Sequence, residues 1–497
     1  MLKNTFLLVF LLAGFLSLDA QVATPGGLLR EKFVLEHPGS FNSTPPPANN
    51  GSGLRSGLTD ALDQAFDSVT ALSTLTGFTA AVVLPSGDVW KRAHGANAGF
   101  PVMTTLNTNH LMGMGSITKT FVATTLLLLA EDGLVDLDDS IGQYVGPYPN
   151  IDGSATLRQL LSHRTGFNDY LNENPAMINT WVANLDSIWV ADTVLNHYIL
   201  APNFPVGADW SYSNTNFLLA GRIIESVTGQ PWYQVLRDRV LTPQGLTHTF
   251  AYPWESTGNQ QIAHVWLDID GNGTVEDAIG LGLPIEGFFS LGNSAGCLLS
   301  TPEDIGRFME RLFSGNILLP SSLAEMQTDY VQNPAEGLQY GLGAASFAGF
   351  PMENWGHDGS IIYKSWGLYF PDLDIAIVVQ QNDDRIAALN PQLIDLVDVF
   401  VSLFVTYIDN APSSGAGAPV LAAVPFAVPN PTAGRLHLHL PADQSLPAPC
   451  VLRDAQGRPV WSQTIETPDT DISLDQLPAG LYHLQAGRQL EKVLLMR

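Results

Sequence analysis

Basic residues are scarce in this chain. Its 497 residues include 22 Lys and Arg against 48 Asp and Glu, which gives a formal net charge of −26 at pH 7. Nucleic acid and anionic membrane surfaces repel such a protein, so neither is an expected partner. Charged residues of either sign make up only 14% of the chain, and hydrophobic residues make up 45%. That balance supports a large buried core and excludes a mainly disordered acidic chain.

Cysteine is scarcer still, since Cys297 and Cys450 are the two that the chain contains. Two thiols exclude a disulfide scaffold, a multi-cysteine metal site and an iron–sulfur cluster. They fall in what we expect to be separate domains, so we predict two free or buried thiols. We also predict that the protein needs no cofactor.

Long hydrophobic runs are rare, and the clearest one, Phe6–Phe15, lies at the N-terminus. It follows Lys3 and precedes the possible cleavage tripeptide Leu18-Asp19-Ala20, which is the pattern of a secretory signal. The run is shorter than the roughly 20 apolar residues that span a bilayer. We therefore predict a signal peptide over residues 1–20 and an exported protein without a transmembrane anchor.

Two segments of small and turn-forming residues separate the rest of the chain into domains. Residues 21–56 are rich in Pro, Gly, Ser and Asn and are predicted to form a flexible leader. Residues 409–424 contain the run APSSGAGA, which is typical of a linker. The domain between them is predicted to cover residues 57–408.

Periodicity within this domain predicts both helices and strands. Helical patterns begin at Thr59 and cover about 118–132, 214–228 and 391–407, and strand patterns cover 78–84, 89–93, 361–370 and 374–380. Strands at both ends with helices between them predict an α+β domain whose sheet joins the two ends of the segment.

Residues 425–497 consist of short strand patterns and turns, which predict a small all-β sandwich. This module resembles the C-terminal sorting domain of the type IX secretion system in Val428–Gly434, Asp454–Arg458, Leu477–Tyr482 and Lys492–Arg497. The resemblance implies the type IX machinery of a Gram-negative bacterium as a partner. It also implies translocation across the outer membrane, followed by release or attachment to the cell surface. A generic β-sandwich accessory domain is the alternative.

The strongest chemical signal is Ser116-Ile117-Thr118-Lys119, just ahead of an apolar helix. Ser116 and Lys119 share one helix face at i and i+3, so the amine can reach the hydroxyl. Burial and the helix N-terminus both favour a neutral amine, which can accept the serine proton. A weak hydroxyl nucleophile needs such an adjacent base. By itself, so short a motif also arises by chance.

Two other stretches carry suitable polar groups, although each alone is an ordinary turn. Tyr212-Ser213-Asn214 precedes the helical pattern that ends at Gly229. A tyrosine beside a lysine can lose its proton more easily and relay it to a leaving group, and an Asn amide can orient a substrate carbonyl. His357-Asp358-Gly359-Ser360 is predicted to be a turn before the strand at Ile361. Its glycine lets a substrate approach, and the following N–H is placed to donate to an oxyanion.

Together and in this order, the three stretches resemble the serine hydrolases of the class C β-lactamase and penicillin-binding-protein family. Leu160–Gly166, Glu131–Asp139 and Gly296–Asp304 match as well, and the resemblance covers about residues 59–405. It implies an antiparallel sheet flanked by helices plus an all-helical region. The implied roles are Ser116 as acylated nucleophile, Lys119 as base, Tyr212 as proton relay, Asn214, His357 and Gly359 in substrate binding, and the backbone N–H groups of Ser116 and Ser360 as oxyanion hole. His163 would be structural.

One position departs from the family pattern. Where β-lactamases of this type carry Lys-Thr-Gly, this chain has His357-Asp358-Gly359. Asp358 places an acid beside the place where substrate carboxylates usually bind, which favours an ester or a neutral amide over a penicillin or a peptide ending in a free carboxylate. We therefore predict an exported serine hydrolase, resembling an esterase or a D-Ala-D-Ala carboxypeptidase more than a β-lactamase. The alternative is a catalytically inactive surface or binding protein that retains the fold.

A rival nucleophile is Ser294, because Gly292–Gly296 fits the G-x-S-x-G pattern of α/β-hydrolases. That elbow needs a helix immediately after the serine. Here Ser300-Thr301-Pro302 predicts a new helix start instead, which disfavours the elbow.

A calcium loop is the remaining candidate. Asp268, Asp270 and Asn272 match the first half of an EF-hand loop, but position twelve is Ile279 in place of a bidentate Glu. We prefer a polar turn or hairpin insertion and leave weak calcium binding open.

Overall fold

The computed structural model describes residues 56–72, 75–99, 102–269, 274–331, 337–348, 350, 352–383, 397, 400–401, 427–428, 435–439, 446–453, 459–467, 469–477, 480–486 and 489–495. Described residues up to 401 belong to one compact unit, and those from 427 onward belong to a second. The predicted signal peptide, the leader before Ser56, the linker and most of the predicted helix over 391–407 lie outside the described residues. Within the described part of the chain, no helix is long and apolar enough to cross a membrane.

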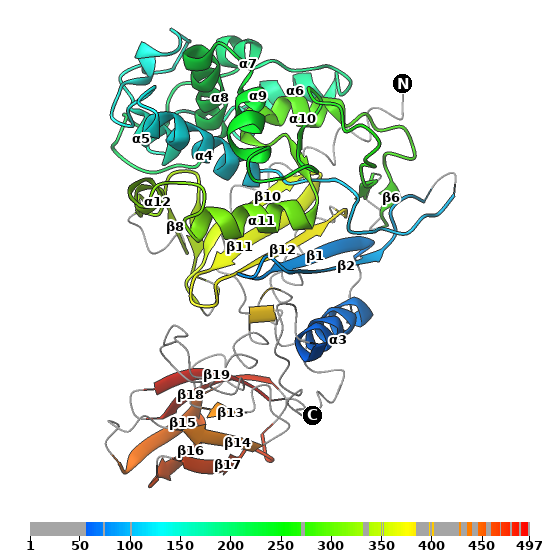
Figure 1. Cartoon of the computed structure of the whole chain (residues 1–497), viewed down its shortest axis with the longest axis vertical. Coiled ribbons are helices and arrows are strands. Elements are labelled where there is room, and N and C mark those ends of the chain that lie inside the picture. The colour runs from blue at the N-terminus through cyan, green and yellow to red at the C-terminus, as the bar shows by residue number, and fades with distance from the viewer. Residues whose placement is uncertain are drawn as a thin grey trace. The chain divides into compact units, whose positions relative to one another are not determined.

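The larger unit contains a seven-stranded antiparallel sheet whose central strands come from opposite ends of the segment (Figure 1). β1 (Gly77–Val83) pairs with β12 (Ile375–Gln381), so that Ala80 lies opposite Val379. The strand order is β2 (Val89–Gly95), β1, β12, β11 (Tyr363–Phe370), β10 (Trp355–Ile361), β9 (Ala345–Phe347) and β8 (Leu338–Tyr340). The prediction of an α+β domain closed by its two ends is therefore confirmed.

β10 corrects one expectation from the sequence. His357–Ser360 lies inside this strand, not in a turn ahead of a strand. Its glycines concealed the strand, because glycine is depleted in strands and often marks a turn. Close packing requires them here: a Cβ at Gly356 would lie 2.0 Å from the carbonyl oxygen of Gly367, and one at Gly359 would lie 1.9 Å from that of Met114.

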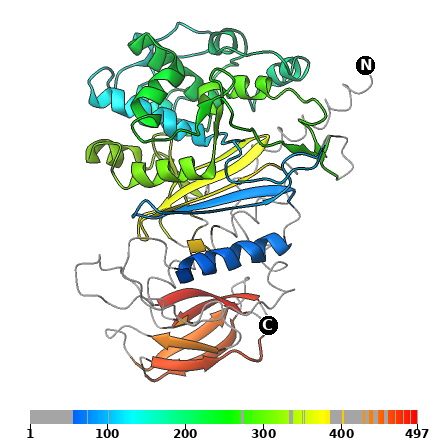
Figure 2. The same ribbon diagram turned by 45° about the vertical axis from the view of Figure 1, so that its right-hand side comes forward.

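Helices cover both faces of the sheet. α11 (Pro302–Phe313) packs on one face, where Gly306 lets the helix approach the valines of β1 and β12. α3 (Ser56–Leu72) packs on the other, where the rings of Phe66 and Phe78 are 5.1 Å apart. Figure 2 shows the two helices on opposite sides of the strands. Burial from both sides explains why every residue of β1 is buried and its sequence is mostly apolar rather than alternating.

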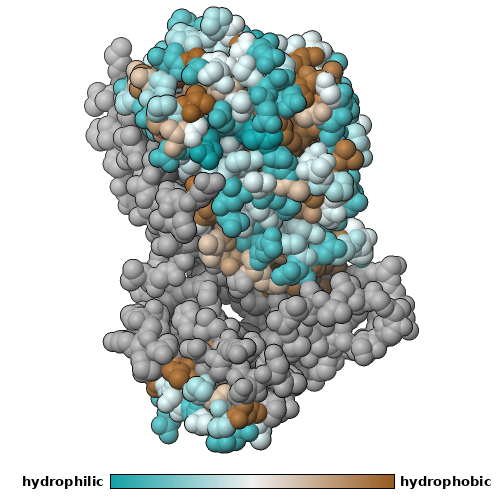
Figure 3. Space-filling model, turned by 90° about the vertical axis from the view of Figure 1, so that its left-hand side faces the viewer, coloured by the Kyte–Doolittle hydropathy of each residue, from teal (hydrophilic) through white to brown (hydrophobic). Residues whose placement is uncertain are grey.

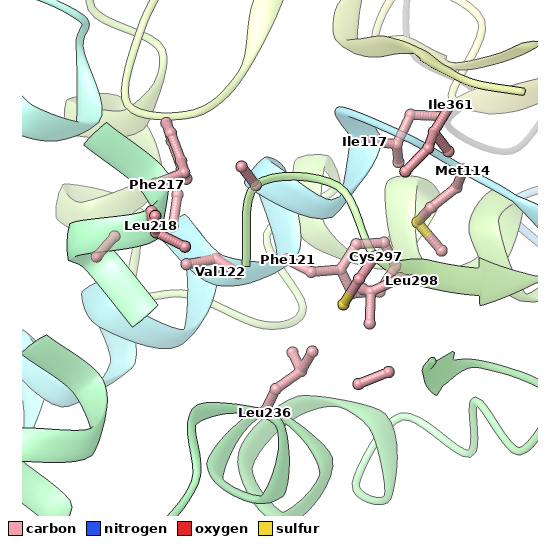
Figure 4. Packing of buried hydrophobic residues seen from close by; sticks show 14 of the residues in the cluster. Met114, Ile117, Phe121, Val122, Phe217, Leu218, Leu236, Cys297, Leu298 and Ile361 are labelled. Atoms are coloured by element: carbon pink, nitrogen blue, oxygen red, sulfur yellow. The ribbon is translucent and has the colours of Figure 1, made fainter. Parts of the chain in front are cut away.

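A helical region contains the predicted nucleophile. Its central helix, α4 (Ile117–Glu131), is apolar on nearly every side and buried over most of its length. Figure 4 shows Met114, Ile117 and Ile361 packed together where α4 begins, so apolar contacts hold the helix start against β10. The other helices are α5 (Leu157–Leu161), α6 (Pro175–Val182), α7 (Ala191–His197), α8 (Asn214–Thr228), α9 (Trp232–Leu236), α10 (Glu286–Gly292) and α12 (Pro320–Met326). The remaining short strands are β3 (Met112–Gly113), β4 (Phe250–Ala251), β5 (Trp266–Leu267), β6 (Glu276–Asp277) and β7 (Leu298–Ser300).

The C-terminal unit consists of strands in two antiparallel sheets, as predicted. One contains β13 (Ala427–Val428), β14 (Arg435–His439) and β17 (Asp469–Ser473), and the other contains β16 (Pro459–Ile465), β15 (Ala448–Arg453), β18 (Gly480–Ala486) and β19 (Gln489–Leu495). Cys450 lies in the core of this unit and Cys297 in that of the larger one, and both thiols are free and buried as expected. Residues 429–434, 454–458, 478–479 and 496–497 of the sorting-domain motifs lie outside the described residues.

The surface of the larger unit is mixed. On the face shown in Figure 3, hydrophobic residues occur in small separate groups among hydrophilic ones. Scattered apolar residues of this kind are normal for a surface in contact with water.

Candidate active site

Ser116 lies at the start of α4, where two glycines bring neighbouring chain segments together. Gly115 has φ +52°, and a Cβ there would lie 2.5 Å from the backbone nitrogen of Ser360. A Cβ at Gly359 would in turn lie 2.9 Å from the backbone nitrogen of Ser116. The two nitrogens therefore belong to directly adjacent segments, at the positive end of the α4 dipole. Adjacent nitrogens are a prerequisite of the predicted oxyanion hole, which stays a prediction.

Lys119 is completely buried one turn further along α4. Its Nζ lies 2.9 Å from Oγ of Ser116, 2.8 Å from Oδ1 of Asn214 and 2.8 Å from the carbonyl oxygen of Ala295. The Asn214 amide is oriented by Asp169, whose Oδ2 accepts a hydrogen bond from Nδ2 at 2.9 Å. The Asn214 and Ala295 oxygens can only accept, so both receive an N–H of Lys119. A neutral amine has two hydrogens and one lone pair, which leaves the lone pair for the Ser116 hydroxyl.

The charge state of Lys119 suits a base. Burial lowers the pKa of Lys119 to about 7, and the carboxylates of Asp169 and Asp358 counteract part of that effect. A large fraction of the amine is therefore neutral near pH 7, which is where a general base works best.

Tyr212 lies beside this pair, with its ring centroid 4.9 Å from Nζ of Lys119. Its hydroxyl is buried and forms no hydrogen bond within the described residues. Burial raises the pKa of Tyr212 well above its usual value, Tyr340 adds to the rise, and the nearby Ser116 hydroxyl offsets part of it. The expectation that Tyr212 loses its proton more easily is thus not met in the resting site. A phenol that stays protonated suits donation to a leaving group.

A chain of hydrogen bonds lies behind Tyr212. The hydroxyl of Tyr340 is 3.1 Å from Nε2 of His163 and 3.1 Å from Nε2 of His357. The Tyr212 ring packs against the imidazole of His163 at a centroid distance of 4.3 Å. His163, Tyr340 and His357 are each at most 3% exposed. This chain of hydrogen bonds is therefore shielded from water.

Two backbone groups, the N–H of Ser213 and the carbonyl of Asp358, determine the hydrogen-bond directions in this chain. Ser213 N–H donates to Nδ1 of His163 at 3.1 Å, so His163 carries its own proton on Nε2. That proton is donated to the Tyr340 hydroxyl. Nδ1 of His357 lies 2.6 Å from the carbonyl oxygen of Asp358, which can only accept, so a neutral His357 carries its proton on Nδ1 and accepts the Tyr340 hydroxyl proton at Nε2. Burial lowers the pKa of His163 well below its usual value, which agrees with a neutral ring.

Two of the residues expected to bind substrate have other contacts. Asn214 is 6% exposed, and its amide is engaged by Lys119 and Asp169, so it orients the amine in the resting site. His357 is 3% exposed and faces Tyr340. Neither side chain forms an open wall of a cleft, because the strand and helix that carry them direct them inward. The roles of Tyr340, Asp169 and the Ala295 carbonyl had no local sequence signal.

Ser294 is not placed as a nucleophile. It is completely buried and donates to the carbonyl oxygen of Phe217 at 2.8 Å. α10 precedes it and β7 follows it, which is the reverse of a strand-to-helix elbow. α11 begins at Pro302 behind a Thr301 cap, as the sequence predicted.

The described residues on either side of the candidate calcium loop form paired strands. β5 pairs with β6, with Leu267 opposite Glu276, which confirms a hairpin at this place. Asp270 and Asn272 lie outside the described residues, while Asp268 lies within them. In the described segments, no group of three or more His, Cys, Asp or Glu could hold a metal ion.

The sheet, the helical region and the Ser–Lys pair at the start of a buried helix define a β-lactamase-like protein. Residues 63–398 match the protein family described as "Beta-lactamase", and the chain belongs to that family.

Known proteins support the assignment. The chain is 25% identical over 277 residues to "Penicillin-binding protein 4*" of Bacillus subtilis (strain 168), which covers 53% of this chain and 56% of that protein. It is 29% identical over 198 residues to "D-aminopeptidase" of Cereibacter sphaeroides, covering 38% and 35%. The crystal structure of D-amino acid amidase from Ochrobactrum anthropi SV3, complexed with L-phenylalanine amide, has a TM-score of 0.61 at 27% identity and covers 71% of this chain and 99% of that one. The chain spans about a quarter to two thirds of the length of the curated relatives that it matches.

Proposed function

We propose that this protein is an exported serine hydrolase that forms an acyl-enzyme on Ser116. Its substrate is an ester or amide, such as a small ester, a D-amino-acid amide or a D-amino-acid peptide, with β-lactams less favoured. The observation that carries the proposal is the 2.9 Å contact between Nζ of Lys119 and Oγ of Ser116, with an amine whose pKa is about 7. Hydrolase relatives that act on D-amino acid derivatives, by their names, make such substrates the first to test.

In the proposed reaction, Ser116 attacks the substrate carbonyl while its proton moves to the lone pair of Lys119. The N–H groups of Ser116 and Ser360 stabilise the resulting oxyanion. Tyr212 donates its proton to the departing alcohol or amine and recovers one from Lys119. Water then attacks the acyl group, and its proton passes through Tyr212 and Lys119 to Oγ of Ser116. The acid product is released, and Ser116 is restored.

The test is covalent labelling of the purified protein with a fluorophosphonate probe and a fluorescent penicillin. Ser116→Ala should abolish labelling and hydrolysis of short esters while circular dichroism shows an unchanged fold. Wild-type protein that stays inert to all probes and esters would instead favour a binding protein that retains the fold.

Export and sorting belong to the same proposal. Residues 1–20 would act as a signal peptide, and 425–497 as a type IX sorting module joined by the 409–424 linker to the hydrolase domain over 57–408. The separate all-β C-terminal unit supports this division. In a Gram-negative host with a type IX system, deletion of 425–497 should leave the protein in the periplasm. Secretion unaffected by the deletion would make the module a generic accessory domain.

A further inference from the structure

The carboxylate of Asp358 lies at the site and is open to water. Its side chain is 51% exposed, and its Oδ1 lies 3.5 Å from Nδ1 of His357. The other acid near Lys119, Asp169, is only 2% exposed and accepts hydrogen bonds from Asn214, Asn172 and the backbone of Leu171. Asp169 is thus occupied in holding the site together, whereas Asp358 presents its charge to whatever enters from solvent.

Asp358 is also close to the reacting atoms. The next residue, Gly359, packs directly on the backbone of Met114 and Ser116, and the one after it provides the second proposed oxyanion N–H. The charge of Asp358 reaches the buried amine of Lys119 as well. A substrate whose carbonyl is held between Ser116 and Ser360 would therefore have its neighbouring groups within reach of this carboxylate.

The sign of the charge determines which group is favoured there. An ammonium gains a charge-assisted contact with Asp358, whereas a carboxylate is repelled. The net charge of −26 over the whole chain acts in the same direction, since it concentrates cations and disfavours anions around the protein.

We propose that Asp358 is a specificity residue that binds a cationic ammonium group of the substrate, so that the preferred substrates are esters or amides carrying such a group a few bonds from the scissile carbonyl, on the acyl or the alcohol half. This inference rests on the proposed acylation of Ser116. It goes beyond the exclusion of anionic substrates, because it requires a positive preference for a cation over a neutral group of the same size.

Two matched substrate sets test the proposal and locate the ammonium. In the first, the cation is on the alcohol half: acetylcholine is compared with its uncharged isostere 3,3-dimethylbutyl acetate. In the second it is on the acyl half: β-alanine ethyl ester is compared with its N-acetyl and N-succinyl derivatives. In one of the two sets, we expect kcat/KM to be about tenfold higher for the cationic ester than for its neutral counterpart. The anionic N-succinyl ester should have the lowest kcat/KM. In 1 M salt the preference should shrink, because screening weakens exposed charge pairs.

The Asp358→Asn variant should bring the cationic-to-neutral ratio close to one. Lys364→Gln is the matched control, because Lys364 lies opposite Ser360 on β11 and its loss changes the local charge in the opposite sense. That variant should retain the preference or increase it. Equal rates for cationic and neutral esters in both sets, or a preference that survives in Asp358→Asn, would overturn the proposal while leaving the serine mechanism intact. Absence of both turnover and Ser116 labelling would overturn the serine mechanism, and this inference with it.

Discussion

The side-chain oxygen of Asn214 accepts a hydrogen bond from Nζ of Lys119 at 2.8 Å, and this contact fixes the direction of the amine's lone pair. With Asn214 and the Ala295 carbonyl each taking one N–H, the lone pair of a neutral Lys119 faces the Ser116 hydroxyl. Under the proposed mechanism, this geometry prepares Ser116 for deprotonation before any substrate is present. It also makes the reactivity of Ser116 depend on the protonation state of one buried amine.

The first prediction is a pH dependence. Because only the neutral form of Lys119 can accept a proton, the rate of Ser116 labelling by an uncharged fluorophosphonate should rise with pH through about 7. The Asp358→Asn variant removes a charge that favours the ammonium, so its midpoint should move to lower pH. Rates measured between pH 5 and 9 give both midpoints. A midpoint that moves upward in the variant would contradict the assignment of Lys119 as the base.

The second prediction concerns Tyr340. Its replacement in Tyr340→Phe leaves Nε2 of both His163 and His357 without a partner, at a cost of about 1–3 kcal/mol in the free energy of unfolding. Because the Tyr212 ring packs on His163, we expect kcat to fall by roughly tenfold with KM little changed.

Tyr369→Phe is the control for this change. Tyr369 donates to Asp374 at 2.8 Å, away from the site, so its loss should lower stability without lowering kcat. Equal losses of kcat in the two variants would mean that Tyr340 acts through general stability alone.

The third prediction separates the two candidate serines. Ser294→Ala removes one buried hydrogen bond to the Phe217 carbonyl and should cost about 1 kcal/mol of stability, while full labelling and hydrolysis remain. Mass spectrometry of the labelled wild-type protein should find the probe on the peptide containing Ser116. A Ser294→Ala protein that folds but is no longer labelled would move the nucleophile to Ser294.

The fourth prediction tests the close approach of Gly115 to Ser360. Gly115 and Gly133 both have positive φ, +52° and +73°, but a Cβ at Gly133 would meet nothing within 4 Å. Gly133→Ala should therefore show only the left-handed strain of about 1–2 kcal/mol. Gly115→Ala adds a clash with the backbone nitrogen of Ser360 and should be less stable and at least 100-fold slower in acylation. Urea denaturation and labelling rates distinguish the two effects, and equal behaviour of both variants would show that this approach is unimportant.

The fold was largely predictable from local patterns. The largely apolar pattern of α4 and the strand patterns of β1 and β12 are properties of short stretches, and they placed these elements within about two residues. β10 was missed because glycines weaken the sequence pattern of a strand. These glycines leave room for the carbonyl oxygens of Met114 and Gly367, which approach the strand closely. The only sequence signal of a close backbone contact between distant segments is a glycine. A glycine is equally typical of a turn, so it does not distinguish the two.

Some features of the candidate site were likewise predictable from the sequence, and others were not. The sequence by itself determined the pairing of Ser116 with Lys119, because an i, i+3 spacing on a helix brings two side chains together in any fold that keeps the helix. It also determined the acidic charge and the presence of Asp358 in the His-Asp-Gly stretch. Only the tertiary structure decided the rest: His163 and Tyr340 are 177 residues apart, and the charge state of Lys119 depends on complete burial among groups from several segments. Burial and proton direction are properties of the assembled environment, since each depends on which distant donors and acceptors surround a group, and no local pattern of residues specifies them.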